Sequence, residues 1–213
     1  MKPPPEGMSC QGGPDPSLRD AVRIGRSFCV VPPGVQGPAG LLAITLQRAR
    51  AFGSGGHETT RSCLEELEDL PVPEGASCLD LGTGTGILAV AACRLGAGRI
   101  LALDNDLEAA AACRANASAN GMGERITPLC ATLDAVGPTA VFHLILANLY
   151  GDILERLATR FAALLLPGGV ALLSGIGFGD ATGIRRRLAD SGLELLRNRY
   201  LTEYVTMVWR KPA

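Results

Sequence analysis

The sequence has almost no net charge and no apolar run long enough to cross a membrane. Lysine and arginine together number 20 and aspartate and glutamate 21, so the formal net charge is -1. Because attraction to nucleic acid or to an anionic membrane needs an excess of positive charge, we expect neither as a direct partner. No apolar stretch reaches the roughly 20 residues of a membrane helix, and residues 1–13 lack the apolar core of a signal peptide.

Closely spaced cysteine pairs are absent as well. The seven cysteines form no CxxC motif, and several of them stand inside apolar runs. This distribution indicates small buried thiols rather than a disulfide framework or a zinc site. We therefore expect a cytoplasmic protein that holds no metal ion.

The chain divides into three segments by composition. Residues 1–20 are rich in proline and glycine, which predicts a disordered leader. Residues 21–50 contain three short strand-like runs and predict a small β-rich segment. Residues 51–213 are long enough for one complete α/β domain. Near the start of this domain, a loop with three glycines precedes a helix predicted from about residue 59 to residue 70.

Strands and helices alternate through most of the predicted domain. The strands are predicted at 77–81, 99–103, 125–129, 142–147 and 170–174, and the helices at 87–95, 107–119, 151–165 and 180–190. Strands as apolar as FHLILA are buried on both faces, which is typical of a parallel sheet. The last two runs, LELLRNRYL and EYVTMVWRK, follow each other closely and predict a hairpin. The sequence thus predicts a doubly wound, mostly parallel α/β sheet of seven strands with a C-terminal antiparallel hairpin.

Three glycines occupy alternate positions in the segment CLDLGTGTGILAV, at Gly82, Gly84 and Gly86. Glycine weakens strands and helices, so its repetition indicates that the backbone passes close to something. The segment joins the first strand of the sheet to its helix, where doubly wound proteins bind ligands. The dinucleotide motif GxGxxG does not fit, because its third glycine falls one position later. With Asp80 before it, the pattern resembles the first motif of class I S-adenosylmethionine (AdoMet) methyltransferases.

Two polar residues end neighbouring strands beside this glycine turn. Asp104 follows the second strand, and a carboxylate there can accept both hydroxyls of a ribose. The alternative is that it only starts the next helix, a role that suits Asp106. Asn148 ends the fourth strand and is expected to face the reactive end of the ligand, with a helix N-cap as the alternative.

Histidine and arginine offer weaker indications. His57 is either a general base or a residue that packs and hydrogen-bonds within the glycine-rich loop, and we favour packing. His143 lies inside an apolar strand and is predicted to be a core histidine with satisfied hydrogen bonds. The run from Arg185 to Arg187 is interpreted as a solvated helix face rather than a nucleic-acid patch, because the net charge is near zero.

The segment around His57 carries a resemblance to a known family. AFGSGGHETT, at residues 51–60, resembles AFGTGTHPTT in PrmA, the methyltransferase of the large-subunit ribosomal protein numbered eleven. Further segments that resemble this family are LDLGTGTGILAVAACRLGA, ALDNDLEA, ANASANG, ANLYGDILERLA and LLPGGVALLSGI. The resemblance covers roughly residues 20–213. It implies that residues 51–213 form an AdoMet-binding methyltransferase domain.

The resemblance also implies individual site residues. The AdoMet contacts of the family fall on Thr60, Gly82, Asp104 and Asn148, and the glycine turn adds Gly84 and Gly86 as cofactor-binding residues. Asn148 is the one predicted catalytic residue.

The sequence departs from the family pattern in four places. Glu58 replaces a proline, Gly56 replaces the second threonine of the loop, and Gln47, Arg48 and Ala49 replace an Asp-Pro-Gly before it. The fourth is the proline-rich leader, which stands where the family has a separate N-terminal substrate-recognition domain.

The implied activity is methyl transfer from AdoMet to an amine nitrogen of a protein, a lysine, with a ribosomal protein as one candidate. Other readings stay open: a methyltransferase for another protein or a small molecule, a non-catalytic AdoMet-binding protein, or an NAD-dependent oxidoreductase. The sequence does not predict the oligomeric state or the number of methyl groups added.

Overall fold

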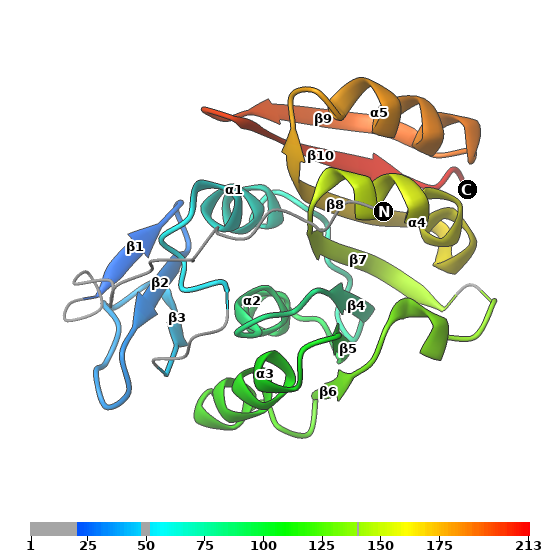
Figure 1. Cartoon of the computed structure of the whole chain (residues 1–213). Coiled ribbons are helices and arrows are strands. Elements are labelled where there is room, and N and C mark those ends of the chain that lie inside the picture. The colour runs from blue at the N-terminus through cyan, green and yellow to red at the C-terminus, as the bar shows by residue number, and fades with distance from the viewer. Residues whose placement is uncertain (1–20, 48–51, 140) are drawn as a thin grey trace, which may run out of the picture.

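A seven-stranded sheet runs through the centre of the protein (Figure 1). The computed structural model describes residues 21–47, 52–139 and 141–213. The strands of the large sheet are β4 (Ser77–Leu81), β5 (Arg99–Asp104), β6 (Ile126–Cys130), β7 (Phe142–Asn148), β8 (Leu165–Gly177), β9 (Glu194–Tyr200) and β10 (Tyr204–Arg210). Their order is β6-β5-β4-β7-β8-β10-β9. All neighbours from β6 to β8 are parallel, whereas β10 is antiparallel to both β8 and β9, which confirms the predicted fold class.

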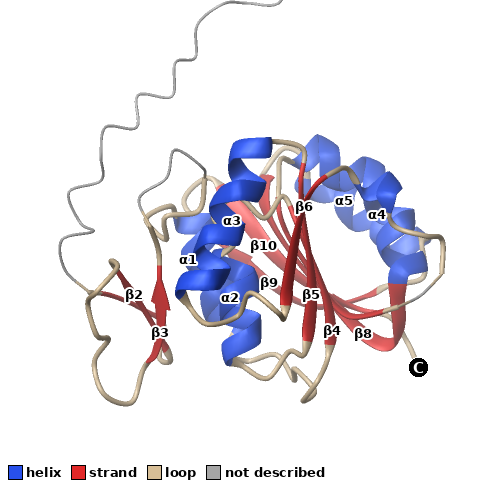
Figure 2. Cartoon of the chain, turned by 90° about the horizontal axis from the view of Figure 1, so that it is seen from below, coloured by secondary structure: helices blue, strands red, loops and turns tan. Residues whose placement is uncertain are grey.

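Helices cover both faces of this sheet. They are α1 (Glu58–Leu67), α2 (Ile87–Arg94), α3 (Leu107–Ala119), α4 (Gly151–Leu164) and α5 (Ala181–Asp190), with a short 3-10 turn at Leu133–Ala135. Helices α1, α2 and α3 lie on one face, and α4 and α5 lie on the other (Figure 2). Successive residues of β7 pack on opposite faces: Leu144 belongs to the core with α1 and α2, and Ile145 to the core with α4 and α5. The apolar strands are therefore buried on both faces of the sheet, as their composition predicts.

A second, three-stranded sheet lies beyond α1 and α2 (Figures 1 and 2). It consists of β1 (Val22–Ile24), β2 (Phe28–Val31) and β3 (Leu42–Thr45), with β1 antiparallel and β3 parallel to β2. The backbone N–H of Thr45 donates to Asn120 Oδ1 over 2.9 Å, and Asn120 Nδ2 donates back to the carbonyl of Thr45 over 2.8 Å. The side chain of Asn120, the C-cap residue of α3, thus pairs with β3 as a neighbouring strand would.

Most element boundaries agree with the sequence predictions, but one strand and the burial of one histidine differ. Strand β8 begins at Leu165, directly after α4, and is much longer than the predicted 170–174. The prediction that His143 is a core residue is wrong, because its side chain is exposed at the amino end of β7. There its Nδ1 lies 2.9 Å from Ser77 Oγ. The predicted leader, residues 1–20, lies outside the described residues.

The cysteine distribution follows the expectation only in part. Five of the described cysteines are buried, namely Cys29, Cys63, Cys78, Cys93 and Cys113, whereas Cys130 is exposed. Within residues 21–47, 52–139 and 141–213, no helix has the length and apolar character that a membrane crossing requires. The same residues contain no group of three or more histidine, cysteine, aspartate or glutamate side chains arranged to hold a metal ion.

Candidate active site at the carboxyl edge of the sheet

A cavity of about 730 Å³ opens at the carboxyl ends of β4, β5 and β7. Strand β4 is the first strand of the large sheet along the chain. The next strands, β5 and β6, lie on one side of β4, and β7 lies on the other. The cavity therefore lies where the strand order reverses, the usual ligand position of doubly wound folds. Four predicted site residues line it: Gly82, Gly84, Asp104 and Asn148.

The glycine turn, residues 82–86, is shaped by the protein's own packing. Its three glycines have φ angles of +69°, +52° and +81°, in the left-handed region that favours glycine. A Cβ at Gly84 would overlap the carbonyl oxygen of Phe52, and one at Gly82 would overlap the side chain of Leu149. At Gly86, a Cβ would lie 2.7 Å from Cys113 Sγ. The close approach that the glycine spacing indicates is thus already made by other parts of the chain.

Asp104 is held with its carboxylate on the cavity wall. Its Oδ2 accepts a hydrogen bond from the backbone N–H of Gly84 over 2.9 Å, and its Oδ1 accepts one from the backbone N–H of Asp106 over 3.1 Å. The cap of α3 is Asp106, whose side chain accepts from the N–H of Glu108 over 2.8 Å. Each carboxylate oxygen of Asp104 retains a second lone pair, so the fixed group can accept two further hydrogen bonds.

A second carboxylate, Asp80, lies beneath the turn and does not face the cavity. It is 1% exposed, and its Oδ2 accepts from the hydroxyl of Thr83 over 2.7 Å. Burial, with a smaller contribution from the charge of Asp104, raises the pKa of Asp80 to about 6 although the Thr83 hydrogen bond opposes the shift. Asp80 therefore contacts the turn from inside through Thr83, and its ionised form is disfavoured by burial.

The loop of residues 52–57 lies against the glycine turn. The backbone N–H of Thr85 donates to the carbonyl of Phe52 over 3.0 Å, and the Thr85 hydroxyl donates to the carbonyl of Gly53 over 2.7 Å. Behind them, the buried Asn116 donates to the carbonyl of Thr85 over 2.8 Å and accepts from the N–H of Gln47 over 2.8 Å. These hydrogen bonds connect the loop, the turn and the end of the small sheet.

His57 caps α1 and packs between aromatic rings. Its Nδ1 accepts from the N–H of Thr59 over 3.3 Å and lies 2.8 Å from the Thr59 hydroxyl. The ring centroid lies 5.3 Å from that of Phe52 and 5.6 Å from that of Tyr204. All four residues line the cavity, and the three rings form an aromatic wall on this side of it.

Asn148 completes the site on the side of β7. Its Nδ2 donates to the hydroxyl oxygen of Thr60 over 3.3 Å. The N-cap of α4 is Tyr150, so Asn148 does not cap that helix. Thr60 is 1% exposed and, like Gly86, is not among the residues that line the cavity, in contrast to Thr59 of the same helical turn.

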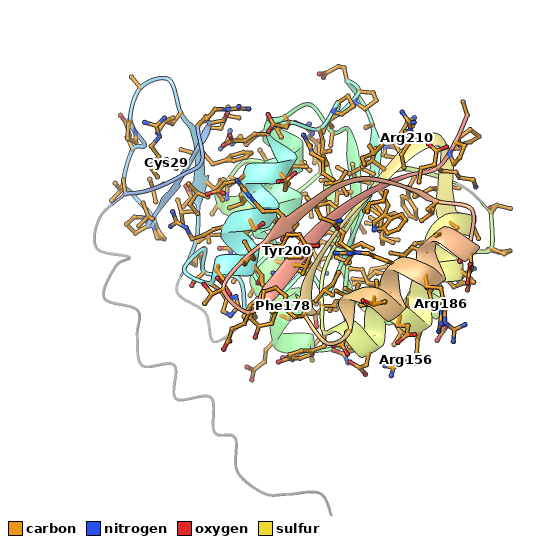
Figure 3. The ribbon with its side chains drawn as sticks, turned by 90° about the horizontal axis from the view of Figure 1, so that it is seen from above. Cys29, Arg156, Phe178, Arg186, Tyr200 and Arg210 are labelled. Carbon is orange, nitrogen blue, oxygen red and sulfur yellow. The ribbon has the colours of Figure 1, made fainter. Side chains whose placement is uncertain are left out.

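Several lining residues carry no motif in the sequence. Ala131, Thr132, Leu133 and Asp134 follow β6 and line the cavity, as do Tyr150 and Tyr204. For residues 131–134, the sequence offered one indication, which is that they follow a predicted strand. A separate, shallower cavity of about 340 Å³ lies beside α5, where Phe178 and Tyr200 are neighbours (Figure 3).

Together, the doubly wound sheet with its antiparallel end and the site at the strand reversal define a class I methyltransferase fold. A crystal structure of a ribosomal protein L11 methylase from Lactobacillus delbrueckii matches with a TM-score of 0.81 and 28% identity, covering 91% of this chain and 99% of that chain. The cyclase SpnF matches with a TM-score of 0.61 and 17% identity, over 71% of this chain and 81% of that chain. The fold alone therefore does not specify the reaction.

Sequence comparison specifies the family. Residues 19–212 match the family model described as ribosomal protein L11 methyltransferase (PrmA), and the chain belongs to this family. The ribosomal protein L11 methyltransferase of Pelobacter propionicus is 39% identical over 198 residues, which cover 90% of this chain and 63% of that protein. The resemblance noted in the sequence is confirmed. The chain spans about half to two thirds of the length of most curated relatives that it matches.

Proposed function

We propose that this chain is an AdoMet-dependent methyltransferase that acts on an amine nitrogen of a protein, a lysine side chain. The observation that carries the proposal is the carboxylate of Asp104, fixed by two backbone N–H groups on the wall of a cavity that Asn148 also lines. Membership of the PrmA family supports the same activity. Relatives named for ribosomal protein L11 make a ribosomal protein the first acceptor to test.

The residues of the cavity fit AdoMet. A volume of about 730 Å³ lies within the range of roughly 300–1,000 Å³ that small-ligand sites occupy. Asp104 would accept the ribose hydroxyls, and Ala131 and Leu133 offer apolar surface for an adenine ring. Gly82 and Gly84 would approach the methionine portion. The proposed role of Gly86 is indirect, because it shapes the turn against Cys113.

The protein's contribution to the reaction is alignment and exclusion of water. When bound, AdoMet supplies a methyl group on a positively charged sulfur, which keeps the electron pair of the broken carbon–sulfur bond as the nitrogen–carbon bond forms. The wall of Phe52, His57 and Tyr204 shields this end of the cavity. Holding the reacting groups in line contributes roughly 7–11 kcal/mol to lowering such barriers.

The acceptor amine must arrive without a proton. A lysine amine has an ordinary pKa of about 10.4, and desolvation beside a positive charge lowers that pKa. Asn148 would orient the neutral amine, which loses a proton to solvent after the transfer. His57 has its Nδ1 engaged by Thr59, which supports packing and capping over general base catalysis.

The cytoplasm is the proposed compartment. A ribosomal protein acceptor would be met there, and the buried thiols suit a reducing environment. Another protein or a small molecule remains the alternative acceptor.

Transfer of a labelled methyl group from AdoMet to ribosomal protein L11 and to the total protein of the same source would test the proposal. We expect labelling of one protein band by the wild-type chain and much weaker labelling by Asp104→Ala at the same AdoMet concentration. AdoMet binding in calorimetry without labelling of any protein or small amine would indicate a non-catalytic AdoMet-binding protein. Binding of NAD in place of AdoMet would show that the class itself is wrong.

A further inference from the structure

The cavity of about 340 Å³ beside α5 has two exposed aromatic rings and one arginine in its wall. Phe178 and Tyr200 lie side by side with their ring centroids 6.4 Å apart, and they are 50% and 62% exposed (Figure 3). Arg185 of α5 meets the end of β9, where its Nη2 donates to the hydroxyl of Tyr200 over 2.8 Å. The cavity thus combines accessible aromatic surface with a cation held in place.

The charge of Arg185 is poorly compensated by the rest of the described chain. Its side chain is partly buried, unlike those of Arg186 and Arg187, and no described carboxylate forms an ion pair with it, whereas Arg187 pairs with Glu155 at 3.7 Å. Its Nε is buried and has no hydrogen-bond partner among the described residues. Because this N–H has lost water without gaining a partner, an anion at the remaining N–H groups of the guanidinium would be stabilised more than at a fully solvated arginine.

The acid that begins α5 does not serve this arginine. Asp180 faces the start of α4 instead, since a Cβ at Gly151 would lie 2.6 Å from its Oδ2. That contact also shows how close the two cavities lie, because Tyr150, the residue before Gly151, lines the active-site cavity. Gly175 lines the active-site cavity as well, and Phe178, three positions later, lines the second one.

Both cavities open at the same edge of the large sheet. Strand β9 is parallel to β8, because both are antiparallel to β10, so Tyr200 ends its strand at the same carboxyl edge as Asn148. In the order β7-β8-β10-β9, three strand spacings of about 4.8 Å give about 14 Å between these two strand ends. An extended chain crosses that distance in about four or five residues, at about 3.3 Å per residue.

We propose that the cavity beside α5 binds an acidic side chain of the acceptor protein, about four or five residues from the lysine that is methylated. The inference rests on the proposed function and deepens it, because it names a second feature of the acceptor. The guanidinium of Arg185 suits a carboxylate, and the rings of Phe178 and Tyr200 offer apolar surface to the aliphatic part of the same side chain. Arginine and tyrosine are also the residue types enriched where proteins bind one another.

Synthetic peptides test the proposal on the unaltered protein. Each peptide has one lysine in a background of glycine, serine and alanine, with one glutamate at a chosen distance on either side, and each has a twin with glutamine in place of glutamate. Methylation with labelled AdoMet gives KM for every peptide. We expect glutamate four or five residues from the lysine, on one side, to lower KM roughly fivefold relative to its twin, the upper end for a partly exposed ion pair. Equal KM for glutamate and glutamine at every distance would overturn the proposal.

Two arginine variants locate the effect. Arg185→Met keeps a long apolar stem and removes the charge, so it should make KM for the favoured glutamate peptide equal to that of its glutamine twin. Arg186→Met is the matched control, because Arg186 is exposed on the same helix and does not line the cavity, and it should keep the preference. Thermal unfolding checks that both variants fold. A glutamate preference that survives in Arg185→Met would overturn the proposal.

One measurement needs no methyl transfer. The Nε–Hε resonance of Arg185, assigned by its loss in Arg185→Met, should shift when the favoured glutamate peptide is added without AdoMet, and should stay in place with the glutamine twin. No shift at saturating peptide would overturn the proposal. If the wild type binds AdoMet but labels no peptide or protein, the proposed function fails, and this resonance still shows whether the cavity binds a carboxylate. A dimer in sedimentation that Arg185→Met separates would assign the cavity to a second copy of the chain and would also overturn the proposal.

Discussion

The glycine turn and loop 52–57 are both rich in glycine, but they are held in different ways. Gly82, Gly84 and Gly86 meet the protein's own atoms at every position, between β4 and the buried helix α2. In the loop, Gly55 is similarly enclosed, since a Cβ there would lie 3.2 Å from Ile24 Cδ1, but Phe52 is 56% exposed. Thr85 attaches the loop by two hydrogen bonds. Glycine content alone therefore does not separate an enclosed turn from a partly exposed loop, whereas the contacts do.

The largest expected effect comes from filling the space where the two segments meet. Gly84→Ala forces a left-handed residue, at about 1–2 kcal/mol, and a clash with the carbonyl of Phe52, at about 1–3 kcal/mol. Gly121→Ala is the matched control, because Gly121 has a φ of +70° and nothing lies within 4 Å of the place that a Cβ would take there. Denaturant unfolding should show a clearly larger loss of the free energy of unfolding for Gly84→Ala. Equal losses in the two variants would mean that the loop moves away from the new Cβ without a measurable loss of the free energy of unfolding.

The pH dependence of stability should report on the turn rather than the loop. The folded pKa of Asp80, about 6, lies above its ordinary value near 3.9, so the folded state binds the proton more tightly than the unfolded state. Stability from this group is present below about pH 4 and decreases as the pH rises to about 6, by roughly 3 kcal/mol in total. Between about pH 4 and pH 6, the free energy of unfolding of the wild type should therefore fall relative to that of Asp80→Asn. A difference that stays constant from about pH 4 to about pH 7 would contradict the raised pKa.

Asp104 lies between the glycine turn and the cavity. Asp104→Ala removes a carboxylate that accepts from Gly84 and, in our proposal, from the ribose. Affinity for AdoMet should fall by roughly 1.5–3 kcal/mol, the worth of hydrogen bonds to a charged group. Calorimetry measures the loss, and thermal unfolding checks that the variant folds. Unchanged affinity in a folded variant would remove Asp104 from the site.

The smallest effect is expected where the loop is attached. Thr85→Val removes the hydrogen bond to the carbonyl of Gly53, worth about 1 kcal/mol, and should speed hydrogen exchange across residues 52–57. Thr85→Ser keeps the hydroxyl and should exchange like the wild type. AdoMet should slow exchange across residues 52–60 in all three proteins, since we expect this segment to close over the methionine end. Identical exchange with and without AdoMet would make the loop a fixed part of the scaffold.

The sequence predicted the sheet well because burial on two faces leaves a strong signal in every central strand. The sequence also indicated that Gly82, Asp104 and Asn148 lie near one another, since the carboxyl ends of parallel strands meet at one edge of a sheet, and all three line the cavity. The place of Thr60 behind Asn148 was out of reach, because it depends on a contact between α1 and β7 across 88 residues. The exposure of His143 was not predicted, because an apolar strand indicates high average burial and does not show which of its residues stay exposed.

The hydrogen bonds of Asn116 and Thr85 bear on the connectivity of the chain. The backbone N–H of Gln47 donates to Asn116, and the backbone carbonyl of Phe52 accepts from Thr85. Gln47 and Phe52 are therefore each attached to the methyltransferase domain by a hydrogen bond. Ile24, Phe28 and Ile44 of the small sheet are buried in the same core as α1 and α2. A proteolytic cut between Gln47 and Phe52 would therefore break the covalent chain while leaving two fragments associated, as a noncovalent complex that separates only when this shared core is opened.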